Sequence, residues 1–184
     1  QGYSSAASDV YKRQLWGYTK KMVIADNLSQ YVSLVYGDVS GISGPNLVAA
    51  TVLFAVQLYM DFSGCCDIAL GAARILGYDL IENFQSPFEA RTFNDFWRRW
   101  HITLSTFFRD YVYIPLGGNR RGRARQVLNL FIVWALTGLW HGASWNFVLW
   151  GLYYFLILVL EKFVLGKLLQ KLPRILRHIW SLLV

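Results

Sequence analysis

Residues 126–160 form a stretch of 35 residues without a single Asp, Glu, Lys or Arg. As a helix, a stretch of that length would measure about 52 Å, or two legs of about 26 Å against a hydrocarbon layer of roughly 30 Å. The middle of the stretch, "TGLWHGASW", carries small residues that allow a turn. The stretch therefore predicts two antiparallel membrane spans, at about 126–141 and 144–160.

The composition supports a membrane protein. Apolar residues make up 55% of the chain and aromatic residues 17%, whereas charged residues make up 16%, against about a quarter in soluble domains. Trp and Tyr collect where a protein meets lipid headgroups. We expect an all-α, multi-pass integral membrane protein.

The net charge of +7 is spread over short basic clusters that flank apolar segments. This distribution is typical of the positive-inside rule and argues against a nucleic-acid-binding face. Arginines at 120–125 precede the hairpin and basic residues at 162–177 follow it. Both ends of the hairpin are therefore expected on the cytoplasmic side, with its turn toward the opposite face.

The other segments are less uniform. Residues 1–14 are polar, without helical periodicity, and are expected to be a non-native or disordered leader. Residues 15–35 predict a partly embedded or interfacial helix. Residues 46–60 are uncharged and predict a segment that enters the bilayer and stops at Asp61, after which small residues recur at helix-packing spacing.

Residues 93–114 predict an amphipathic helix. Asn94, Trp97, His101 and Leu104 would lie on one stripe, and the segment has too many charges to face lipid all round. We expect it to lie in the interface or to re-enter the protein, and to end at Pro115.

His141 is the only side chain in the 35-residue stretch that titrates near neutral pH. A histidine at such a position can simply bond a neighbouring helix, but ionisable groups at membrane depth are costly and usually functional. We expect His141 inside the protein, in a polar pocket or channel. A neutral imidazole there is a suitable general base.

Two other motifs are expected to converge on His141. "RRWHITLS" supplies His101, and "YMDFSG" supplies Asp61 and Ser63 at a helix end. No metal site is expected, because the two histidines are forty residues apart and no HExxH pair is present. The adjacent cysteines are expected to be small apolar fillers, and no GxSxG hydrolase motif occurs. Of the reaction types considered, acid–base chemistry on a hydroxyl is the one that remains.

Four motifs carry a family resemblance: "KKMVIADNLS" (20–29), "LYMDFSG" (58–64), "FWRRWHITLSTFFRDYVYIPLGGNR" (96–120) and "TGLWHGASWNFVLWG" (137–151). Together they resemble the membrane-bound O-acyltransferases, and most closely the bacterial alginate O-acetyltransferase branch. The resemblance covers roughly residues 15–165. It implies that residues 15–184 are part of that family's membrane domain, without the spans that precede them in the family.

The resemblance implies an enzyme of the bacterial inner membrane that moves an acetyl or other acyl group to a hydroxyl of a cell-envelope polysaccharide. The donor would be an acyl thioester, acetyl-CoA or an acyl carrier, with no tightly bound cofactor. By the family's motifs, His141 is the catalytic residue and His101 the second functional histidine. His141 would take the hydroxyl proton, and His101 would orient or polarise one reactant, for example through the thioester carbonyl.

Further residues are candidates for the site, although a structural role would explain each of them equally well. Substrate-tunnel candidates, which packing or helix ends would equally explain, are Asp61, Ser63, Asn94, Trp97, Trp100 and Trp140. Donor or carrier contacts, which topology alone would explain, are Arg120, Arg121 and Arg123. The expected partners are the bilayer, a polysaccharide, an acyl carrier and periplasmic acetylation proteins. A transporter or flippase subunit with a histidine proton relay, and a non-catalytic scaffold of an exopolysaccharide assembly, stay open as alternatives.

Overall fold

The computed structural model describes the backbone of residues 2–183 and the side chains of residues 8–183. The described chain is helical, with one isolated β-bridge between Phe84 and Trp100. It divides into two compact units, Gln1–Glu82 and Asn83–Val184.

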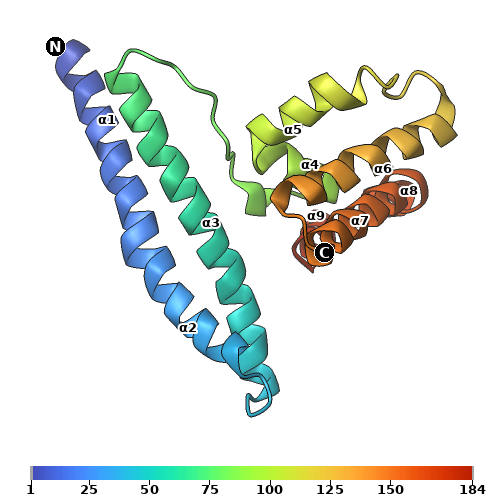
Figure 1. Cartoon of the computed structure of the whole chain (residues 1–184), viewed down its shortest axis with the longest axis horizontal. Helices are drawn as coiled ribbons and strands as arrows, with labels where there is room; N and C mark the ends of the chain where they lie inside the picture. Colours follow the sequence, from blue (N-terminus) through green and yellow to red (C-terminus); the bar gives the residue numbers. More distant parts are fainter. Residues whose placement is uncertain (1, 184) are drawn as a thin grey trace. The chain divides into compact units, whose positions relative to one another are not determined.

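The first unit is a pair of antiparallel helical rods (Figure 1). One rod consists of α1 (Gly2–Tyr18), a π-helical segment (Thr19–Ala25) and α2 (Asp26–Gly37). The other is α3 (Gly44–Ile75), a single helix of 32 residues. The rods approach closely where glycine faces glycine, because a Cβ added at Gly17 would lie 2.8 Å from the carbonyl oxygen of Gly64.

Charged side chains in this unit pair between the rods. Lys20 Nζ lies 2.7 Å from Asp67 Oδ2, and Lys21 Nζ lies 3.0 Å from Asp61 Oδ1. The expected stop at Asp61 is therefore wrong, since α3 continues through this residue for another 14 positions. The carboxylate of Asp61 does not end the helix because a lysine of the facing rod neutralises it there.

Residues 1–14 were expected to be a non-native or disordered leader. Residues 2–14 are helical in α1, contrary to the expected disorder, and their being non-native stays a prediction. Arg13 anchors the end of this segment: its guanidinium donates to Asp67 Oδ1 and to both carboxylate oxygens of Glu82. The hydrogen bonds from Arg13, and secondarily its charge, hold the pKa of Glu82 below its usual range. Residue 1 of the expected leader lies outside the described residues.

The second unit contains the predicted hairpin. In chain order its helices are a 3₁₀ helix (Pro87–Glu89), α4 (Phe93–Arg99), α5 (Ile102–Phe108), a π-helical segment (Arg109–Tyr113), α6 (Gly122–His141), α7 (Trp145–Leu160), a π-helical segment (Glu161–Leu165), α8 (Gly166–Lys171) and α9 (Arg174–Leu183). Helices α6 and α7 pack against each other, with the turn at residues 142–144. A Cβ at Gly151 would collide with the carbonyl oxygen of Trp134, so this crossing requires glycine.

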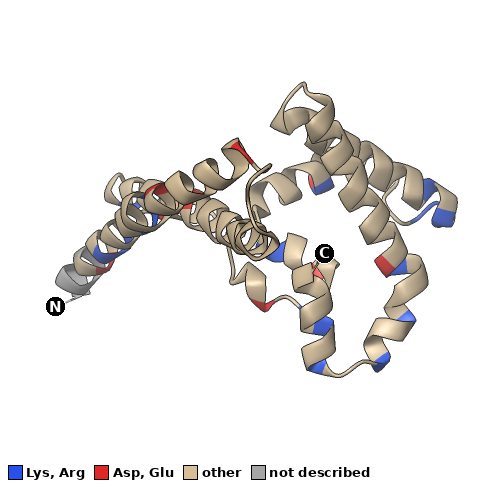
Figure 2. Ribbon diagram, turned by 90° about the horizontal axis from the view of Figure 1, so that it is seen from below, with Lys and Arg blue, Asp and Glu red and all other residues tan. Residues whose placement is uncertain are grey.

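Within the described residues, two helices are long and apolar enough to cross a membrane: Gly44–Ile75 and Trp145–Lys171. The predicted span in α6 is not one of them, because its first two turns carry Arg123, Arg125, Gln126 and Asn129. Residues 126–160 carry no charged side chain, and the charged residues of the hairpin come before and after this stretch. In Figure 2, where Lys and Arg are blue and Asp and Glu are red, uncharged helix is tan.

The amphipathic segment is not one continuous helix, contrary to the prediction. It breaks between α4 and α5, where Trp100 is extended and His101 adopts the left-handed conformation with φ 47° and ψ 54°. The cause lies outside the segment. The backbone of Trp100 pairs with that of Phe84, and the flanking bonds run from Gln85 N to Arg99 O (3.0 Å) and from Ile102 N to Asn83 O (3.1 Å).

Candidate active site

A pocket of about 480 Å³ lies in the second unit, between the α4–α5 segment and helix α6. Helix α6 contributes Leu130, Val133, Trp134, Thr137 and His141. These positions follow the helical period and form one face, which from Leu130 to His141 is about 16 Å long. The pocket is therefore elongated along α6.

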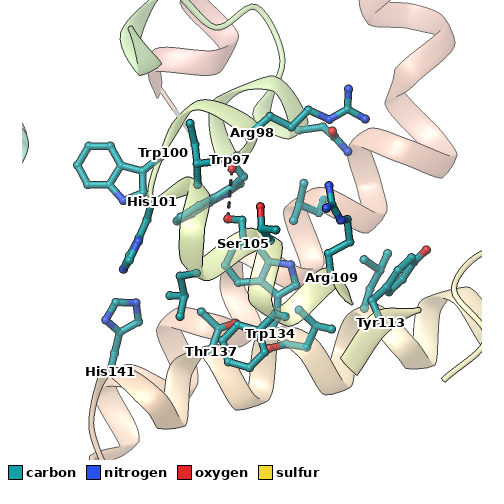
Figure 3. Close-up of a pocket in the computed structure, with 18 of the residues that line it drawn as sticks. Trp97, Arg98, Trp100, His101, Ser105, Arg109, Tyr113, Trp134, Thr137 and His141 are labelled. Carbon is teal, nitrogen blue, oxygen red and sulfur yellow. Dashed lines mark hydrogen bonds between the residues drawn. The ribbon is translucent and has the colours of Figure 1, made fainter. Parts of the chain in front are cut away.

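The two histidines meet at one end of this pocket. Figure 3 shows the imidazoles of His101 and His141 facing each other there. The ring of Trp140 contacts both, with centroid distances of 5.9 Å to His101 and 4.9 Å to His141. Trp150 lies on the hairpin side, 4.9 Å from the His141 ring.

His141 is the last residue of α6, lines one end of the pocket and is exposed in this chain. The expectation that His141 lies inside the protein, in a polar pocket or channel, is therefore only partly met: the residue faces a pocket, but it is exposed and its ring neighbours are aromatic. The last turn of α6 places it there, where Gly142 ends the helix.

His101 is half-buried, and its conformation depends on the side chain of Asn83. Asn83 Oδ1 accepts from the backbone N–H of Thr103 (3.1 Å) and from the Thr103 hydroxyl (2.7 Å), and it lies 3.3 Å from His101 Nδ1. This oxygen satisfies a donor in the first turn of α5 that would otherwise lack a partner. Burial, and secondarily the charge of His141, lower the pKa of His101 to about 4.

Aromatic side chains form the inner wall of the pocket. The ring of Trp97 lies 4.8 Å from Trp134 and 5.1 Å from Tyr154, both edge-on. Phe93, Trp134 and Leu158 form the buried core of this unit, and Trp134 and Leu158 also line the pocket. The wall is aromatic and largely apolar, which suits a pocket that keeps water from a reacting group.

Helix α4, which carries Trp97, is held at its start by a buried carboxylate from the hairpin. Glu161, at the end of α7, is 6% exposed. Its Oε2 accepts from the backbone N–H of Phe93 (2.8 Å) and from Trp180 Nε1 (3.2 Å), and its Oε1 accepts from the N–H of Asn94 (3.0 Å). A carboxylate at a helix N-terminus is favoured by both the unpaired N–H groups and the helix dipole.

The end of the pocket away from the histidines is cationic. Arg98 and Arg109 line it, and Figure 3 shows both on the far side from His141. Lys162 also lines the pocket, just beyond α7. Asp110 pairs with Arg109, with Oδ1 2.7 Å from Nε. Since basic groups outnumber acidic ones along the lining, this end favours an anionic ligand group.

The predicted site residues divide between the two units. His101, His141, Asn94, Trp97 and Trp100 line the pocket. Trp140 lies beside it, against both histidine rings. The expected convergence of these residues is thus observed for the second unit, although the catalytic roles assigned to them stay predictions.

Asp61 and Ser63 lie in α3 of the first unit and do not line this pocket. Both were expected at a helix end, and both are instead in a helix interior. Asp61 pairs with Lys21, and Ser63 is buried. Arg120, Arg121 and Arg123 are exposed at the start of α6 and also lie outside the lining of the pocket.

Several residues of the site were not singled out by the sequence. The cations Arg98, Arg109 and Lys162 look like ordinary topology signals in the sequence, and only the fold brings them to one pocket. Asn83 contacts a residue 18 positions away in sequence, His101, and Glu161 contacts one 67 positions away, Asn94. No local sequence pattern indicates contacts at such separations. Among the described residues, no group of three or more His, Cys, Asp and Glu side chains is arranged to hold a metal ion.

The sequence matches the family of membrane-bound O-acyltransferases over residues 13–178. It is 44% identical over 136 residues to the peptidoglycan O-acetyltransferase of Helicobacter pylori, a match that covers 74% of this chain and 26% of that protein. It is 38% identical over 172 residues to the probable alginate O-acetylase AlgI of Azotobacter vinelandii, covering 94% of this chain and 34% of that protein.

A more distant relative is the teichoic acid D-alanyltransferase of Bacillus subtilis, which is 32% identical over 117 residues. That match covers 60% of this chain and 30% of the relative. The chain thus spans about a quarter to a third of the length of these curated relatives.

Proposed function

Because the chain belongs to the membrane-bound O-acyltransferase family, we propose that its pocket serves acyl transfer. An acetyl or other acyl group would move from a thioester donor to a hydroxyl of a cell-envelope polysaccharide. One observation carries the proposal: two histidines from different elements face each other at one end of an elongated pocket whose other end is cationic.

In this reaction we assign His141 the role of general base. The imidazole takes the proton of the attacking hydroxyl while the hydroxyl oxygen forms a bond to the thioester carbonyl carbon. The carbon–sulfur bond then breaks, and the thiolate leaves with the proton that His141 holds, so the imidazole returns to its neutral form. General base catalysis of this kind contributes roughly 10²–10⁴-fold. The apolar wall around Trp97 keeps water from competing with the alcohol for the carbonyl.

The cationic end of the pocket would receive the donor. Acetyl-CoA and acyl carriers both bear phosphate on the arm that ends in the thioester, and Arg98, Arg109 and Lys162 offer the matching charge. The pocket face between Leu130 and His141, about 16 Å, separates that charge from the histidines. The donor acts as a substrate, and no tightly bound cofactor is needed.

This assignment agrees with the topology expected from the basic residues. If residues 120–125 and 162–171 are cytoplasmic, the donor enters from the cytoplasm and the acceptor reaches His141 from the opposite side. We therefore place the protein in the bacterial inner membrane as a multi-pass enzyme. Arg120, Arg121 and Arg123 would then be available to an acidic acyl carrier, and periplasmic acetylation proteins would meet the other face.

The test is incorporation of labelled acetyl into polysaccharide by the full-length protein, wild type against His141→Gln. Incorporation should fall by at least about 100-fold, as expected for the loss of a general base, while the variant accumulates in the membrane at wild-type level. His178→Gln is the matched control, because His178 lies outside the pocket and bonds the carbonyl oxygen of Ala90.

Undiminished incorporation in His141→Gln would overturn the proposal. That result would instead favour the non-catalytic scaffold. A transporter or flippase with a histidine relay predicts a third pattern, in which movement of substrate depends on His141 but acetyl incorporation by the purified protein is absent from the wild type as well.

A further inference from the structure

Asn83 is the residue that holds His101 in its unusual conformation. It lies 18 residues before His101 in sequence, in the loop that precedes the site, and its side-chain oxygen meets three groups of the α4–α5 junction. A left-handed conformation at a non-glycine residue is costly and requires such support.

The orientation of the Asn83 amide follows from its neighbours. The backbone N–H of Thr103 can only donate a hydrogen bond, so the Asn83 atom 3.1 Å from it must be the carbonyl oxygen. The same oxygen lies 3.3 Å from His101 Nδ1. An oxygen without a hydrogen can only accept, so Nδ1 carries the hydrogen in this contact.

This geometry decides which ring nitrogen of neutral His101 keeps its lone pair. We infer that Asn83 is a positioning residue that fixes His101 as the Nδ1–H tautomer, so that His101 Nε2 accepts a hydrogen bond from a hydroxyl of the acceptor. His101 therefore orients the alcohol and does not donate to the thioester carbonyl. The inference rests on the proposed function and deepens it, since it limits the acceptor to one with a second hydroxyl beside the reacting one.

The division of roles between the two histidines is consistent with the proton balance. The reacting hydroxyl has one proton, which His141 takes, so His101 must accept from a different hydroxyl. Sugar rings carry adjacent hydroxyls, and a polysaccharide therefore supplies both. His101 forms and breaks no covalent bond in this step.

The electrostatic surroundings keep His101 neutral, which a fixed tautomer requires. Burial and the facing His141 lower its pKa to about 4. The other charged groups that line the pocket are Arg98 on α4, Arg109 after α5 and Lys162 after α7, all cations. None of these groups offers a negative charge that would stabilise a protonated His101.

The direct test is ¹⁵N NMR of the histidine rings in the protein in lipid nanodiscs, without substrate. Ring signals that are present in the wild type and absent from His101→Gln belong to His101, so the difference between these two spectra assigns them. We expect His101 Nδ1 to be protonated and Nε2 unprotonated at pH 7. An Nε2–H signal for His101 would overturn the inference, whether or not the proposed function holds.

Variants of Asn83 test the functional consequence in the full-length protein. Asn83→Ala should populate both His101 tautomers and raise the KM for the acceptor by up to about tenfold, the value of one lost hydrogen bond, with the donor KM unchanged. Asn83→Asp keeps an oxygen acceptor, so the Nδ1–H tautomer should persist. Its carboxylate should raise the pKa of His101 and move the acid limb of the rate profile to higher pH.

The matched control is Asn27→Ala, which removes an exposed asparagine amide of the first unit that bonds the carbonyl oxygen of Val23. An Asn83→Ala protein whose tautomer and acceptor KM equal those of Asn27→Ala would refute the role of Asn83. Should Asn83→Ala fail to fold, the wild-type spectrum still decides. Loss of activity in His141→Gln tests the proposed function separately and leaves the tautomer signal unaffected.

Discussion

The carboxylate of Glu161 should be worth several kilocalories per mole to the second unit. It is 6% exposed and accepts three hydrogen bonds, from the N–H groups of Phe93 and Asn94 and from the indole of Trp180. Removing this group tests whether the start of α4 depends on a partner that lies 67 residues further along the chain.

The informative substitution is Glu161→Gln, which keeps the shape but only one acceptor oxygen. Hydrogen bonds to a charged group contribute about 1.5–3 kcal/mol each and neutral ones about 0.5–1.5 kcal/mol. One bond is lost and those that persist weaken, whereas the neutral amide avoids the desolvation cost of a buried charge. The net loss is about 2–3 kcal/mol, which corresponds to a fall in Tm of about 4–12 °C at this chain length.

Thermal unfolding in nanodiscs, followed by tryptophan fluorescence, measures this loss, and Trp97 and Trp134 report on the affected wall. Glu89→Gln is the control, because Glu89 is an exposed carboxylate of the same unit. If Glu161→Gln melts within about 1 °C of Glu89→Gln, the cap does not stabilise α4 and the reasoning is refuted.

Three further outcomes are expected. Gly151→Ala should destabilise the hairpin by about 1–3 kcal/mol, because the added Cβ collides with the carbonyl oxygen of Trp134. The control Gly37→Ala should have no such effect, because no atom lies within 4 Å of a Cβ added there. Equal melting curves for the two variants would contradict this prediction. Lowering the pH from 6.5 towards 4 should weaken the folded state. The pKa of His101 is about 4 in the folded protein and 6.5 in the unfolded chain, so the unfolded chain binds the proton first. The slope of unfolding free energy against pH over this range should be smaller in His101→Gln, and an unchanged slope would contradict the role of His101. Arg98→Gln should raise the donor KM by roughly three- to tenfold, an effect that salt diminishes and that the exposed Arg91→Gln should lack in the same transfer assay.

The sequence alone was enough to predict the family and the hairpin. The resemblance of the four motifs is confirmed by the family match over residues 13–178. The helices α6 and α7 and the turn between them fall where the uncharged stretch and its central glycines indicate. These features are local, since they depend on the order of apolar residues and on small residues that permit a turn.

Polar residues inside apolar segments were predicted less well. Asp61 resembled a helix end, yet α3 passes through it because Lys21 reaches it from the other rod. The stripe of Asn94, Trp97 and His101 resembled one helix, yet the helix breaks at His101 because Asn83 and the backbone of Phe84 bind the junction. The same three residues nevertheless line one pocket, together with residues of α5 and α6.

Only the tertiary structure decided what surrounds the histidines and what holds the start of α4. Periodicity along a chain reports which face of an element is apolar, but it does not report which distant group will neutralise a charge or accept a hydrogen bond. Glu161, Asn83 and the cations at the far end of the pocket act through contacts between segments far apart in sequence, and a buried polar group is stable only where such a partner is supplied. Packing supplies those partners, and so the chemistry of the pocket follows from the fold.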